Sequence, residues 1–77
     1  MNKERRKQLE TIKDKREDLK QEIEQIKDDE DSVRDNMPEN LQDSEKFTNS
    51  EKASDAMETS MDCIDEAISS LDEAIAK

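Results

Sequence analysis

The chain has no glycine, histidine, tyrosine or tryptophan, and only one proline, one cysteine and one phenylalanine among its 77 residues. A single cysteine, Cys63, excludes a disulfide bond within one chain, and without histidine a zinc site is not expected. Catalysis is poorly supported, because a short helical chain cannot enclose a conventional pocket and the usual proton-transfer side chains are missing. We therefore expect no enzyme activity, no cofactor and no metal.

Apolar residues are also scarce, at 29% hydrophobic and 1% aromatic. A domain this small and polar is marginal alone, so oligomerisation is the expected route to stability. The charged fraction of 47% would suit a disordered chain equally well, and only periodicity argues against that. Apolar residues never form the long run that a signal peptide or a membrane span requires, and an unpaired cysteine fits a reducing compartment. We expect a cytoplasmic protein without membrane contact.

Charge is unevenly distributed along the chain, whose formal net charge is −10. Residues 1–20 hold eight Lys/Arg against five Asp/Glu, whereas residues 21–77 hold five against eighteen. A largely acidic surface argues against direct nucleic-acid binding, because it repels the phosphate backbone. The imbalance favours antiparallel or head-to-tail pairing, in which a basic end meets an acidic region.

Residues 2–35 contain neither glycine nor proline, which predicts one helix over about residues 3–35. In a heptad repeat its apolar residues occupy positions a and d: Leu9, Ile12, Leu19, Ile23, Ile26, Val33 and Met37. So narrow a stripe is typical of a seam between helices. Arg16 and Glu30 interrupt the a positions. They either fix register by meeting opposite charges or extend into solvent, and the sequence leaves both open.

The last third of the chain contains a clearer repeat, since residues 64–68 (IDEAI) recur as residues 71–75 (LDEAI). Its apolar residues alternate by four and three, the coiled-coil period: Met57, Met61, Ile64, Ile68, Leu71 and Ile75. This pattern predicts a second helix over about residues 48–76. We interpret these residues, with the apolar row of residues 9–33, as the core of an oligomer.

Residues 36–47 interrupt the helical pattern around Pro38 and predict a turn that contains one short helical turn. Asn36, Pro38 and Glu39 have the arrangement of a helix start, in which Asn36 is the side-chain acceptor. Ser44 and the segment 48–51 offer two starts for the second helix, so its first residue lies between 44 and 50. The expected fold is all-α: a single domain over residues 1–77, an antiparallel two-helix hairpin that assembles into a helical bundle.

Two groups of polar residues are candidate binding sites. Asn40 and Gln42 carry amides that capping does not require, so the loop is either a recognition surface together with Asn36, Pro38, Glu39 and Ser44, or only a turn. A small anionic ligand would need cations, and the best available set is Arg5, Arg6, Lys7 and Arg16.

The string NMPENLQ-x-SE at residues 36–45, preceded by a charged helix that opens MNKERRKQL, resembles a group of short proteins encoded in phages and prophages of Gram-positive bacteria. Lys46 and Phe47 also match, whereas residues 48–50 are more polar than the family pattern. The resemblance covers most of the chain. It implies a small accessory protein without catalytic activity that works in the cytoplasm of an infected cell.

The function most consistent with this context is that of an anti-defence factor. Such a protein would either capture a host immune protein or sequester a small signalling molecule between helices of an oligomer. Two alternatives remain open: a coiled-coil structural or assembly protein without a ligand, and an acidic DNA-mimic inhibitor that occupies a nucleic-acid site.

Overall fold

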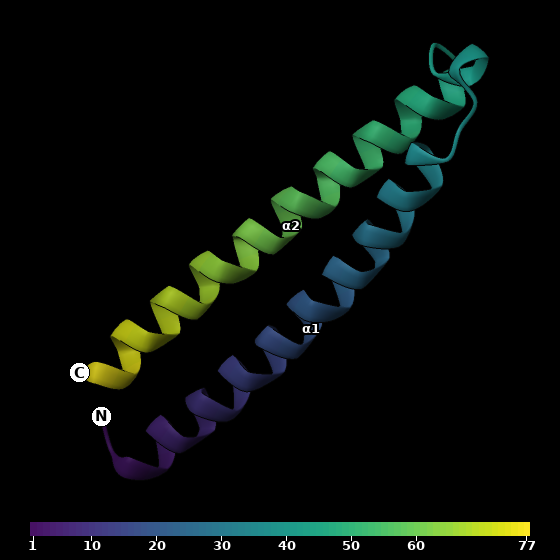
Figure 1. The fold of residues 1–77 in the computed structure, drawn as a ribbon. Coiled ribbons are helices and arrows are strands. Elements are labelled where there is room, and N and C mark those ends of the chain that lie inside the picture. The colour runs from purple at the N-terminus through teal and green to yellow at the C-terminus, as the bar shows by residue number, and fades with distance from the viewer.

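The computed structural model describes all residues, 1–77, as two long helices joined by a short loop (Figure 1). α1 spans Lys3–Asp35, a short 3-10 helix η1 spans Glu39–Leu41, and α2 spans Glu45–Ala76. The helices run antiparallel, so both termini lie at one end of a rod that measures 60 × 15 × 12 Å. The prediction of an all-helical chain with two packed helices is confirmed.

Asparagine side chains close both ends of α1. Asn2 caps the start, where its Oδ1 accepts the backbone N–H of Arg5 at 2.8 Å. Asn36 caps the end and donates its side-chain amide to the carbonyl of Ser32 at 2.9 Å. The expected role of Asn36 as the acceptor of a helix start is therefore wrong. Pro38 explains the difference, because it pushes Met37 away from helical geometry and ends the preceding helix.

The loop uses ordinary backbone conformations throughout, and no residue has a positive φ. Pro38 is extended at φ −58° and ψ 148° and leads into η1. Ser44 then caps α2 by accepting the backbone N–H of Phe47 at 3.2 Å. α2 thus begins at Glu45, within the expected range of 44 to 50, and uses the start that Ser44 offers. Thr48 does not act as a cap, because its hydroxyl donates to the carbonyl of Ser44 inside the helix.

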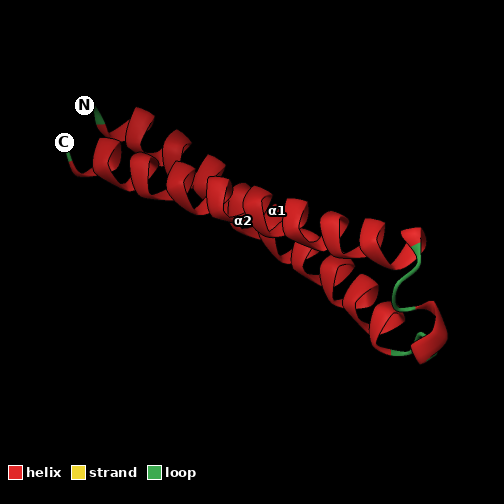
Figure 2. Ribbon diagram, turned by 90° about the horizontal axis from the view of Figure 1, so that it is seen from above, coloured by secondary structure: helices red, strands yellow, loops and turns green.

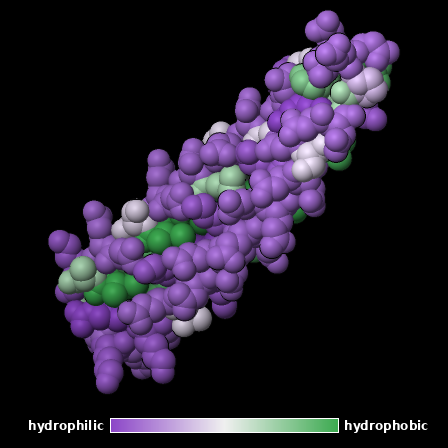
Figure 3. Space-filling model, in the orientation of Figure 1, coloured by the Kyte–Doolittle hydropathy of each residue, from purple (hydrophilic) through white to green (hydrophobic).

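α2 turns its apolar stripe toward α1. Met61 is the most buried apolar residue, at 8% exposure, and the rest of the stripe is half-buried. The face seen in Figure 3 is nearly all hydrophilic, with its apolar patches mainly toward the end that holds both termini. In the view turned by 90° the two helices cross, as expected for helices that coil around each other (Figure 2). Neither helix contains a stretch apolar enough to cross a membrane.

The face of α1 that contacts α2 is not the one that the a and d positions together would form. The half-buried residues of α1 are the a residues Leu9, Ile23 and Glu30, together with Asp31 and five cations: Arg6, Lys13, Lys20, Lys27 and Arg34. The d residues Ile12, Leu19, Ile26 and Val33, which we call the outer row, are exposed. A long cationic side chain can lay its methylene groups on apolar surface while its charged end stays in water, so half-buried cations at these positions explain why α1 does not need its d row for this contact.

Apolar side chains cover the loop end of the hairpin only in part. Met37 and Phe47 are half-buried there, whereas Leu41 is 46% exposed. Leu41 therefore contributes little to covering this end of the hairpin.

Truncating the centre of the α2 stripe should destabilise the fold. Met61→Ala is expected to lower the free energy of unfolding by about 2 kcal/mol, because it leaves a gap between the helices. The matched control Glu66→Ala, on an exposed position of the same helix, should change it by less than about 0.5 kcal/mol. Urea denaturation followed by circular dichroism, at one protein concentration, measures both. Equal effects would show that Met61 does not hold the helices together.

Candidate functional site

Three cross-helix ion pairs, which we call the ion-pair ladder, join the helices along one flank. They are Lys13–Asp72 at 2.8 Å, Lys20–Asp65 at 2.7 Å and Lys27–Glu58 at 3.7 Å. Each pair lies seven residues from the next on both helices. A straight α-helix drifts by about 20° per seven residues, so cations at this spacing stay against α2 only if the helices coil left-handed. The seven-residue spacing of the ladder on both helices therefore matches the antiparallel register of the hairpin.

The pKa of each of the three ladder lysines lies above the ordinary value of 10.5. The main cause is a hydrogen bond to a carboxylate: Asp72 for Lys13, Asp65 for Lys20 and Asp31 for Lys27. The lysines therefore stay charged at any physiological pH. Exposed ion pairs contribute little stability individually, so the ladder selects the register more than it stabilises the hairpin.

A second group of side chains, which we call the polar cluster, joins the two helices near the loop. Arg34 Nη1 donates to Ser50 Oγ at 3.1 Å and to Ser54 Oγ at 2.9 Å, and Arg34 Nη2 donates to Asp31 Oδ1 at 2.7 Å. Ser54 Oγ also donates to Asp31 Oδ1 at 2.7 Å, and Lys27 Nζ donates to Asp31 Oδ2 at 2.9 Å. Ser50 and Ser54 are the most buried residues of the chain, at 6% and 4% exposure. Small serines here let α1 approach closely and supply oxygens for Arg34.

The polar cluster holds Asp31 in its ionised form. The pKa of its carboxyl lies well below the ordinary value, because Ser54 donates a hydrogen bond to it and because Lys27 and Arg34 do so as well. All members of the cluster have partners, so the charges are compensated where they are half-buried.

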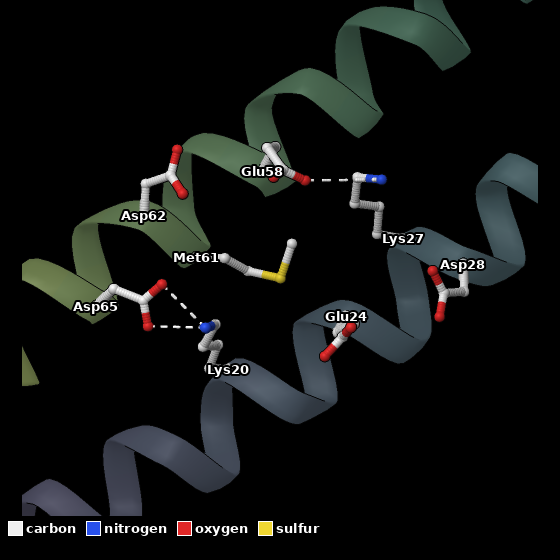
Figure 4. Close-up of a pocket in the computed structure, with 8 residues that line it drawn as sticks. All are labelled: Lys20, Glu24, Lys27, Asp28, Glu58, Met61, Asp62 and Asp65. Carbon is white, nitrogen blue, oxygen red and sulfur yellow. Dashed lines mark hydrogen bonds and ion pairs between the residues drawn. The ribbon is translucent and has the colours of Figure 1, made fainter.

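A shallow groove of about 230 Å³, which we call the acidic groove, opens on the flank of the ladder (Figure 4). Its lining consists of Lys20, Glu24, Lys27, Asp28, Glu58, Met61, Asp62 and Asp65. Met61 projects from α2 toward α1 between the two lysines. Both lysines are already paired, whereas Glu24, Asp28 and Asp62 form no ion pair. The groove therefore presents hydrogen-bond acceptors with excess negative charge.

A neighbouring groove of about 320 Å³ continues the acidic groove toward Ile68 and shares Lys20, Glu24 and Asp65 with it. Its further lining is Glu17 and Gln21. No group of three or more His, Cys, Asp or Glu is placed to hold a metal ion. Cys63 is exposed and lines neither groove. Chemically the two grooves can accept hydrogen bonds and bind cationic groups.

The structure separates the two groups of binding residues expected from the sequence. Asn36, Pro38, Glu39, Asn40, Gln42 and Ser44 lie at the loop end, while Arg5, Arg6 and Lys7 lie at the end that holds the termini. The side chains of Asn40 and Gln42 are exposed and form no hydrogen bond. Arg16 is exposed without an ion pair, so it has no partner within the hairpin. Neither group joins the acidic groove.

The residues that shape this flank were not identified from the sequence, although two signals point to them. The cations Lys13, Lys20, Lys27 and Arg34 recur every seven residues, as a row that faces a neighbour would. Ser50 and Ser54 extend the alternation of three and four residues of the α2 stripe backward from Met57. They therefore occupy core positions despite being polar.

Comparison with known proteins adds nothing to this geometry, because the chain matches no protein-family model, no curated protein and no solved structure.

The polar cluster predicts a pH dependence. Because the folded-state pKa of Asp31 lies below its ordinary value of 3.8, ionised Asp31 stabilises the fold above that pH, and this contribution is lost as the pH falls further. Asp31→Asn should therefore be less stable than the wild type by a constant amount between about pH 7 and pH 5, and the difference should shrink below about pH 4. Urea midpoints across pH measure this. Asp55→Asn, an exposed change on α2, is the control. An Asp31→Asn variant as stable as the wild type at pH 7 would contradict the role of the cluster.

The loop predicts a contrast between Ser44 and the two exposed amides. Ser44→Ala should lower the free energy of unfolding by about 1 kcal/mol, because the first turn of α2 loses its side-chain acceptor. The double change Asn40→Ala with Gln42→Ala should stay within about 0.5 kcal/mol, since neither side chain has a partner in the chain. Chemical denaturation and light scattering check stability and oligomer size. A clear loss of stability in the double variant would make these amides part of the turn.

Proposed function

We propose that the protein is a non-enzymatic binding protein that acts as a helical bundle of hairpins and contacts a positively charged surface of a host protein through its acidic groove. The observation that carries this proposal is the charge of the groove. Five carboxylates line it against two lysines, and both lysines are paired within the chain. Cationic side chains of a partner would supply the missing countercharge.

The surroundings of the groove support a protein partner over a small anionic signalling molecule. An anion in the groove would face Glu24, Asp28 and Asp62, which have no countercharge in the chain. The candidate cations Arg5, Lys7 and Arg16 are exposed and line neither groove. The groove is also open to solvent, which suits a surface of another protein better than a ligand that must be enclosed.

The resemblance to short phage and prophage proteins supplies the biological setting. In that setting the protein is an anti-defence factor in the cytoplasm of an infected bacterial cell, and its partner is a host immune protein. Carboxylates at Glu58, Asp62, Asp65 and Asp72 follow one flank of α2. A row of this kind would suit a basic nucleic-acid site on the partner, which makes acidic mimicry the form of capture that the charges favour.

Recovery of partners from infected lysate, followed by titration of the recovered protein, tests the proposal. The double variant Asp28→Asn with Asp62→Asn should weaken affinity by about fivefold or more, and the wild-type affinity should fall steeply as ionic strength rises from about 50 to 300 mM. Asp18→Asn with Glu66→Gln removes the same charge from positions outside both grooves and should bind like the wild type at the same ionic strength.

Two results would contradict the proposal. If both double variants bind equally, the groove is not the contact surface. If no protein is retained at low ionic strength, the result favours a structural or assembly protein without a ligand, which is one of the two alternatives left open by the sequence.

A further inference from the structure

The outer row is the longest apolar surface that the hairpin leaves uncovered. Ile12, Leu19, Ile26 and Val33 are 42%, 51%, 59% and 55% exposed, respectively. They recur every seven residues over three heptads, or roughly 31 Å at 1.5 Å per residue. Lys13, Lys20 and Lys27 have the same seven-residue spacing, and all three reach α2. Residues at this spacing therefore stay on one side of α1, and the outer row does so as well. Regular spacing of this kind is typical of a seam between helices and not of scattered surface residues.

The outer row lies on the opposite side of α1 from the acidic groove. Ile26 is two residues from Glu24 and two from Asp28, both of which line the groove. Two residues correspond to about 200° around an α-helix, so these side chains point in opposite directions. The outer row can therefore be covered while the groove stays open to a partner.

We propose that a second copy of this chain covers the outer row, with the two α1 helices antiparallel to each other. In this arrangement Ile12 of one copy lies opposite the partner's Val33, and Leu19 lies opposite the partner's Ile26. The inference rests on the assembly of hairpins in the proposed function, and it names the face and the orientation that the assembly uses.

Charges beside the outer row select both the occupant and its direction. Lys15 and Arg16 adjoin the row between Ile12 and Leu19, because each is three or four residues from both. By the same spacing, Asp29 and Glu30 adjoin the row between Ile26 and Val33. None of these four charged residues forms an ion pair within the chain.

An antiparallel second copy satisfies all four charges. Lys15 and Arg16 then lie opposite the partner's Asp29 and the partner's Glu30, and the two-fold axis repeats this contact at the other end. A parallel copy would instead place cations against cations and carboxylates against carboxylates. Like charges in direct opposition weaken an interface, so the antiparallel arrangement is selected. An unrelated partner would need to reproduce this inverted pattern by chance.

Sedimentation equilibrium of the purified full-length chain tests the proposal without any host protein. Lys15→Glu with Arg16→Glu should raise the dimer dissociation constant by about tenfold or more, and Asp29→Lys with Glu30→Lys should do the same. These variants change the net charge in opposite directions, so general repulsion cannot explain a loss in both. Combining all four substitutions restores the net charge and the pairing. That variant should return to within about threefold of the wild type.

A spin label reports the orientation independently. In a Cys63→Ser background, a label on Gln8→Cys should lie about 29 residues along the axis from its counterpart, or roughly 43 Å, if the copies are antiparallel. In a parallel dimer the two labels would be within about 20 Å of each other, since adjacent helix axes are about 10 Å apart. Circular dichroism checks that each variant keeps its helices.

A monomeric wild-type chain, a four-fold variant that stays weak, or closely spaced Gln8→Cys labels would each overturn the inference. All of these measurements use the purified chain alone. A negative result here therefore does not bear on whether a basic partner binds the acidic groove. The groove variants test that binding separately.

Discussion

Lys13, Lys20 and Lys27 lie half-buried on the face of α1 that contacts α2, and each pairs with a carboxylate of α2. Apart from these lysines, α1 turns few apolar side chains toward α2, chiefly Leu9 and Ile23. A lysine at such a position covers the apolar stripe of α2 with its stem and carries its ammonium group to a carboxylate at the edge. The same side chain can thus serve both packing and pairing, and the carboxylates of its pairs lie on α2.

This arrangement explains why the hairpin has two distinct flanks. Because cations cover the seam, the apolar d residues of α1 are not used within the chain and remain exposed. Because the cations reach toward α2, carboxylates gather around them and form the acidic groove. Both surfaces therefore follow from the rotation of α1 about its own axis, which turns the cations toward α2. The exposed apolar row and the acidic groove lie on opposite sides of α1.

Several features of the fold follow from the sequence by simple rules. The absence of glycine and proline before residue 36 predicts α1, and the alternation of four and three residues predicts the stripe of α2. The rotation of α1 does not follow, because Lys20 and Leu19 belong to rows with the same seven-residue period. A pattern rule assigns the leucine to the seam, whereas the structure places the lysine there because a stem of four methylenes and an ion pair together fit the α2 stripe. The polar cluster was missed for a related reason: Ser50 lay in a candidate helix start and Ser54 was given no role, because a pattern of apolar residues does not assign serines to a seam until Arg34 is seen to use their oxygens.

The loop also has a consequence for how this chain can vary. A turn that needed a left-handed residue would require glycine or asparagine at a fixed place, and substitutions there would carry a steric penalty. Here no residue has a positive φ, and Pro38 is the one position whose ring restricts the backbone directly. Apart from the caps Asn36 and Ser44, the remaining loop positions are therefore open to almost any side chain on stereochemical grounds. Selection can change the chemistry displayed at this end of the rod quickly, while the geometry that displays it stays the same.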